Sequence, residues 1–72
     1  MNNARQFHKR QLVWWRVGSN RPSWIPKNQI EQAGEIKDID GDLIMITVLN
    51  ETRTEETYVV PIETIRARGY NG

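Results

Sequence analysis

The chain has no cysteine and only one histidine, His8, among its 72 residues. Disulfides and thiolate metal sites are therefore excluded. A lone histidine with scattered carboxylates does not make the ligand set of a protein metal site. There is also no Ser/His/Asp combination and no glycine-rich phosphate loop. We therefore expect no catalytic activity, no metal and no cofactor.

Long hydrophobic runs are also missing. The longest apolar stretch, residues 43–49, is interrupted by Thr47 and is far shorter than the roughly 20 apolar residues of a membrane span. The N-terminus, MNNARQFHKR, is positively charged, but no apolar segment typical of a signal peptide follows it. We expect a cytoplasmic protein with no membrane partner, and a chain of this length makes one domain with a small core.

Acidic residues are absent from residues 1–30, which carry six basic side chains. All nine acids lie between residues 31 and 65, where the only cations are Lys37 and Arg53. Arg66 and Arg68 follow at the C-terminal end. Because electric fields act locally, the formal net charge of +1 hides a dipolar surface if the two halves stay apart in the fold.

The hydrophobic pattern is that of short β-strands. Residues 12–17, LVWWRV, alternate between two faces and consist of strand-favouring types. Asp40-Gly41-Asp42 is typical of a tight hairpin turn. The predicted elements are strands at 12–17, 34–39, 43–49, 57–60 and 65–68 and a 3₁₀ turn at 61–64, with loops at 18–26 and 50–56. Residues 27–32 are compatible with a helical turn capped by Asn28 but are too few to predict one.

This order of elements resembles the SH3-like small barrel that SH3, Tudor, PWWP, chromo-barrel and KOW modules share. The resemblance is carried by LVWWRV, the long loop after it, the hairpin AGEIKDIDGDLIMITVL and the segment YVVPIETIR. It implies an all-β, five-stranded SH3-like barrel over residues 12–68. Residues 1–11 are predicted to be a flexible basic arm and residues 69–72 a tail.

The alternation separates the tryptophans. Trp15 shares a face with Val13 and Val17 and is predicted to lie in the core, whereas Trp14 points outward. Trp24 lies in a proline-containing loop, where it is either a lid over the barrel or a stacking platform. The predicted core is Val13, Trp15, Val17, Ile36, Ile44, Ile46, Val48, Val60, Ile62 and Ile65.

Pairing of the first and last strands, as the resemblance implies, would place Arg66 and Arg68 beside Trp14 and Arg16. Basic residues beside aromatic residues suit phosphates and stacked bases. The function predicted first is therefore a non-catalytic module that binds nucleic acid or a nucleoprotein assembly; the alternative is a protein-interaction module or accessory subunit. The candidate binding residues are Lys9, Arg10, Trp14, Arg16, Arg21, Trp24, Lys27, Arg66 and Arg68.

Three narrower alternatives have weaker support. Tudor modules hold methylated lysine or arginine in an aromatic cage, for which Trp14, Trp24 and Tyr58 are the candidates. The stretch DIDGD lacks the remaining ligands of an EF-hand calcium loop. YVVPIETIR is similar to a segment of type II dihydrofolate reductases, but residues 57–60 are Thr-Tyr-Val-Val where that family has Val-Gln-Ile-Tyr.

Overall fold

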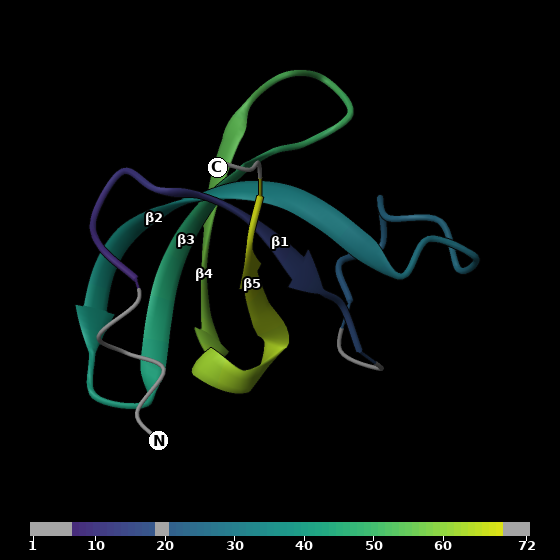
Figure 1. The fold of residues 1–72 in the computed structure, drawn as a ribbon. Coiled ribbons are helices and arrows are strands. Elements are labelled where there is room, and N and C mark those ends of the chain that lie inside the picture. Colours follow the sequence, from purple (N-terminus) through teal and green to yellow (C-terminus); the bar gives the residue numbers. More distant parts are fainter. Residues whose placement is uncertain (1–6, 19–20, 69–72) are drawn as a thin grey trace.

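A single antiparallel sheet of five strands organises the molecule, and its strand order is β4-β3-β2-β1-β5 (Figure 1). The structure is a computed structural model that describes residues 7–18 and 21–68. Its elements are β1 (Leu12–Arg16), β2 (Glu31–Asp40), β3 (Leu43–Leu49), β4 (Glu55–Pro61), the 3₁₀ turn η2 (Ile62–Thr64) and β5 (Ile65–Ala67). The prediction of an all-β, five-stranded fold is confirmed.

Strand β1 is paired along both of its edges. On one side Trp14 lies opposite Ala33 of β2, and on the other it lies opposite Arg66 of β5. Residues opposite each other in an antiparallel pair point to the same face. Val13 and Trp15 are buried on the inner face, while Leu12 and Arg16 are exposed on the outer face. The predicted division of β1 into two faces is confirmed.

Strands β2 and β3 form a hairpin around Gly41, whose φ of +61° suits the first position of a two-residue turn. A register shift between Ile36 and Asp38 marks a β-bulge in β2. Strand β2 begins at Glu31, so the helical turn considered for residues 27–32 does not extend over Glu31 and Gln32. The reason is pairing with β1, which continues past the strand end through the hydrogen bond from the Val17 amide to the Ile30 carbonyl (3.0 Å).

The core lies on the inner face of the sheet. Nine of the ten predicted core residues are buried; the exception is Ile62, which is partly buried against the cluster. Ile25 takes the tenth buried position, with only 2% of its surface exposed. The alternation pattern missed Ile25 because this residue comes from a loop with no strand period. The long connection after β1 therefore contributes to the core as well as linking two strands.

The sheet is not closed among the described residues. β4 and β5 are its two edges, and no pairing joins them. β5 is only three residues long and pairs with β1 from Val13 to Trp15. Closure into a barrel is therefore not observed, although the pairing of the first and last strands and η2 between β4 and β5 are as predicted.

The predicted N-terminal arm is described only from Phe7 onward. Here the Arg10 amide donates to the Ile36 carbonyl (2.7 Å) and the Ile36 amide donates to the Gln11 carbonyl (2.9 Å). Phe7 packs against the core cluster. The flexibility expected of residues 1–11 stays a prediction, and the tail at 69–72 lies outside the described residues. No helix in the described part of the chain is long and apolar enough to cross a membrane.

Replacing Ile46 by aspartate should unfold the domain. Ile46 is fully buried at the centre of β3, and an unpaired carboxylate there should cost more than about 4 kcal/mol of unfolding free energy. The control is Val59→Asp, on a β4 residue that is 57% exposed, which should cost about 1 kcal/mol or less. Urea unfolding followed by circular dichroism measures both. A cooperative transition of Ile46→Asp at the wild-type midpoint would contradict the placement of β3.

The two neighbouring tryptophans of β1 should behave in opposite ways. Trp15→Ala removes a buried side chain and should cost about 3–5 kcal/mol of stability. Trp14→Ala removes a half-buried outer side chain and one cation–π contact, so it should cost about 1 kcal/mol. Chemical denaturation of the two variants tests the register of β1. Equal losses would show that the two faces are not separated as described.

Candidate binding face

The outer face of β1 and β5 brings together four of the predicted site residues. Trp14 and Arg66 are direct cross-strand partners. The Arg68 guanidinium carbon lies 5.4 Å from the centroid of the Trp14 ring, in cation–π contact. Arg16 is the next outward residue of β1. We call Trp14, Arg16, Arg66 and Arg68 the Trp14 face.

A carboxylate enters this basic cluster from β2. Both Glu31 oxygens accept hydrogen bonds from Arg66, at 2.8 Å from Nε and 2.8 Å from Nη2. These bonds lower the pKa of Glu31 and raise the pKa of Arg66. Arg16 lies opposite Glu31 in the β1–β2 pairing but forms no salt bridge within the described residues. Of these two arginines, Arg66 binds Glu31 directly, whereas Arg16 acts on Glu31 only through space.

Trp24 is tied to β4 by side-chain hydrogen bonds. Its indole Nε1 donates to Glu56 Oε1 (3.1 Å) and to the Tyr58 hydroxyl (3.3 Å). Glu56 also accepts hydrogen bonds from Asn50 Nδ2 (2.8 Å) and from the Tyr58 hydroxyl. The half-buried Trp24 ring packs against the core cluster. This network joins the long loop to β4, so the Trp24 side chain is used for structure.

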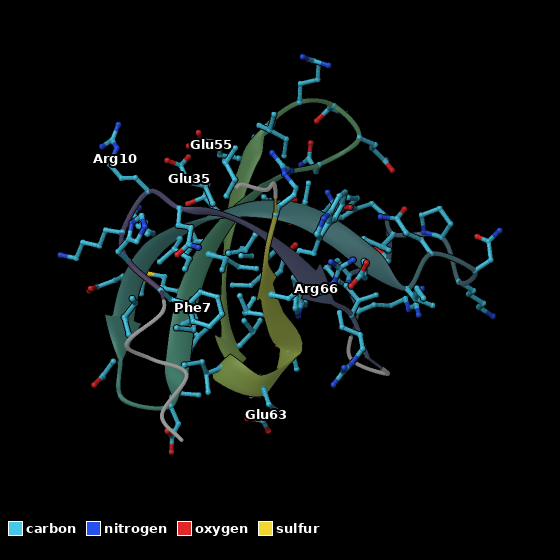
Figure 2. The ribbon with its side chains drawn as sticks, viewed as in Figure 1. Phe7, Arg10, Glu35, Glu55, Glu63 and Arg66 are labelled. Carbon is cyan, nitrogen blue, oxygen red and sulfur yellow. The ribbon has the colours of Figure 1, made fainter. Side chains whose placement is uncertain are left out.

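The remaining predicted site residues lie elsewhere. Arg21 Nη1 donates to the carbonyls of Pro26 and Gln29, which ties the loop together from within. Lys9 Nζ lies 3.7 Å from an oxygen of Asp38. Arg10 points away from the sheet (Figure 2), and Lys27 is exposed in the loop. The structure therefore does not join Lys9, Arg10, Arg21 and Lys27 to the Trp14 face.

The sequence analysis missed a groove on the outer side of the sheet. This outer groove has a volume of about 260 Å³. Leu12 and Leu49 contribute exposed apolar surface, at 47% and 49%. Glu35 and Glu55 add carboxylates to the same groove and are labelled in Figure 2. The signal was present in the outward positions of the predicted strands, where leucine recurs. The residues that matter for its chemistry are Leu12, Ala33, Glu35, Leu49, Glu55 and Arg68.

Two narrower hypotheses find no support in the geometry. Tyr58 lies opposite the buried Ile46 and stacks on Trp15 with ring centroids 5.3 Å apart. It is therefore on the inner face, while Trp14 is on the outer one, so these aromatics do not converge into a cage. No cluster of three or more metal-ligating side chains occurs within residues 7–18 and 21–68.

Comparison with known proteins finds no family model, no curated protein and no solved structure that matches this chain. Function is therefore inferred from the outer groove, the Trp14 face and the charges around them.

Low pH should weaken the hydrogen bonds that join Glu56 to Trp24, Tyr58 and Asn50. Hydrogen bonds from Tyr58, and also from Asn50 and Trp24, hold the pKa of Glu56 below the usual glutamate value of 4.5. A carboxyl whose pKa is lower in the folded state stabilises the fold above its unfolded pKa. That contribution is lost as the pH falls through the lower folded value.

The measurement is the urea midpoint of wild type and Glu56→Gln between about pH 6 and pH 3. The wild-type midpoint should fall more steeply below pH 4.5 than that of the variant. Glu63→Gln, at an exposed position of η2, is the control and should follow wild type. Parallel curves for wild type and Glu56→Gln would contradict the network.

Proposed function

We propose that this protein is a non-catalytic module that binds a polypeptide segment in the outer groove. The observation that carries the proposal is the pairing of exposed apolar side chains with two carboxylates in one groove. The segment that fits has a hydrophobic side chain next to lysine or arginine. This ranks the protein-interaction alternative above nucleic-acid binding.

The charges support this choice of partner. Glu35 and Glu55 form no salt bridge within the described residues, so they are available to an incoming cation. The apolar surfaces of Leu12 and Leu49 would be removed from water on binding, which supplies the non-directional part of the affinity. Phosphate groups would meet carboxylates at the same place, and like charges brought together at an interface are unfavourable.

Nucleic-acid binding is the second candidate, and the Trp14 face is what favours it. Arg16, Arg66 and Arg68 lie around one half-buried tryptophan, as expected of a stacking platform with basic neighbours. Against it stand the bidentate contact of Glu31 with Arg66 and the nearby groove carboxylates. A base stacked on Trp14 would also have to displace the Arg68 guanidinium.

For the fold we propose the SH3-like class. The strand order, the long connection after β1 and the 3₁₀ turn between β4 and β5 support this assignment. Members of a fold class differ in function, so the class adds nothing to the choice of ligand. The cytoplasmic location stays a prediction of the sequence.

Removal of the groove carboxylates should affect the two candidate ligands in opposite directions. Peptides selected from a random displayed library on the wild-type protein should combine hydrophobic and basic residues. Their affinity for Glu35→Gln/Glu55→Gln should fall by about tenfold, because two charge-assisted contacts are lost. Glu63→Gln removes one carboxylate outside the groove and should leave the affinity unchanged.

Labelled single-stranded and duplex oligonucleotides provide the competing measurement. Weak binding at low salt, with no effect of Trp14→Ala, is expected. Nucleic-acid binding would be established instead by steep weakening with salt, a loss of about 1–3 kcal/mol in Trp14→Ala, and tighter binding by the Glu35→Gln/Glu55→Gln variant. Failure to select peptides of the stated composition would overturn the polypeptide proposal.

A further inference from the structure

A second cavity, distinct from the outer groove, opens beside the free edge of β4. It has a volume of about 440 Å³ and lies between the end of β1 and the segment that runs from β4 into η2. We call it the edge pocket. The residues that carry its chemistry are Trp15, Arg16, Tyr58, Val60, Pro61 and Thr64.

One wall of the edge pocket consists of hydrophobic and aromatic side chains that the fold holds in position. Trp15 and Tyr58 are stacked, with an interplanar angle of 28°. The far end of the Tyr58 ring is held by hydrogen bonds with Glu56 and Trp24, while Val60 is buried in the core. A pocket whose walls are already held by the fold loses little conformational entropy when a side chain enters. It has room for a hydrophobic side chain and for the backbone that carries it.

Arg16 lines the edge pocket and forms no salt bridge in the described part of the chain, although the Glu31 carboxylate attracts it through space. Arg16 is also exposed. Its cross-strand neighbour Glu31 is occupied by Arg66, which binds both carboxylate oxygens at 2.8 Å. The Arg16 guanidinium can therefore donate hydrogen bonds to the planar carboxylate of a ligand.

The position along β4 indicates the form of the ligand. Four consecutive residues of β4, from Tyr58 to Pro61, line the pocket. Inner-face and outer-face residues of a strand both take part, so the cavity lies beside the backbone of the strand. One edge of β4 is unpaired, and the free backbone groups of an edge strand can pair with an extended chain.

We propose that the edge pocket binds the C-terminal end of a polypeptide. The hydrophobic side chain of the last residue lies against Trp15, Tyr58 and Val60, and its carboxylate binds Arg16. The preceding residues run along the free edge of β4. This inference rests on the proposed function only in taking a polypeptide as the ligand class, because it concerns a different surface.

The probe is an N-acetylated four-residue peptide that ends in leucine, as the free acid and as the C-terminal amide. Titration is followed by ¹H–¹⁵N correlation spectra of the labelled protein. The free acid should shift the Trp15 indole signal and the amide signals of Arg16 and Thr64 in a saturable manner. The C-terminal amide should bind about tenfold more weakly or worse, because a contact between two charges is lost.

Variants of Arg16 and Arg66 test whether Arg16 supplies the positive charge that binds the peptide carboxylate. Arg16→Gln should weaken binding of the free acid by about tenfold or more. Lys27→Gln is the matched control, since it removes one positive charge from an exposed site outside the pocket. Arg66→Gln should also weaken binding, because it releases Glu31 to pair with Arg16. The double variant Glu31→Gln/Arg66→Gln should restore wild-type affinity.

Several results would overturn the proposal. These are equal binding of the acid and the amide, no effect of Arg16→Gln in a protein that keeps its wild-type melting temperature, or no shift at Trp15 and Thr64. Binding of 4-methylpentanoate as tight as that of the peptide would show that the β4 edge contributes nothing, which overturns the polypeptide assignment.

The proposal for the outer groove and the proposal for the edge pocket can be tested independently. Peptide signals confined to Leu12 and Leu49 and lost in Glu35→Gln/Glu55→Gln would contradict the edge pocket while leaving the groove intact. Shifts at Trp15 that persist in that double variant would support the edge pocket even if no library peptide bound the groove.

Discussion

The double pairing of β1 is the constraint on which the rest of the structure depends. All five of its residues pair with β2 on one edge, and residues 13–15 also pair with β5 on the other. β1 therefore cannot slip by one residue without exchanging its two faces. The present register buries Val13 and Trp15 and leaves Leu12, Trp14 and Arg16 outside. The core, the outer groove and the Trp14 face are all consequences of this one alternation.

The Glu31 carboxylate affects the charge of both the Trp14 face and the edge pocket. Its position at the start of β2 sets it opposite Arg16 in the β1–β2 pairing, yet its two oxygens bind Arg66 of β5. Arg66 of the Trp14 face is thereby bound to a carboxylate, whereas Arg16, which also lines the edge pocket, forms no salt bridge among the described residues. An exposed pair of this kind contributes little to stability, so its consequence lies in which arginine remains available to a ligand.

Local patterns were sufficient to predict most of the fold. Alternation located β1 and β3, Gly41 located the hairpin, and the proline before Ile62 located the turn that precedes β5. The expected pairing of the first and last strands also predicted that Trp14 lies beside Arg66 and Arg68. What escaped prediction was long-range side-chain bonding: Trp24 and Glu56 are 32 residues apart, and Glu31 and Arg66 are 35 apart. Such bonds depend on loop paths and rotamers that no period in the sequence records.

The separation of charge along the sequence does not survive in the folded sheet. Antiparallel pairing of β1 with β2 sets the basic first third of the chain against the first acids that follow it, so that Arg16 faces Glu31 and Leu12 faces Glu35. Strand β5 then returns Arg66 to the same place. The expected dipolar surface is replaced around β1 by an alternation of small patches, a carboxylate-lined groove on one side and a cationic pocket mouth on the other.

Discrimination between ligands at such a surface depends on where each charge of the ligand lies, because like charges brought together at an interface are unfavourable. A surface of mixed sign favours a ligand that carries both hydrophobic groups and charges in a fixed order, which is a property of polypeptides more than of a uniform phosphate backbone.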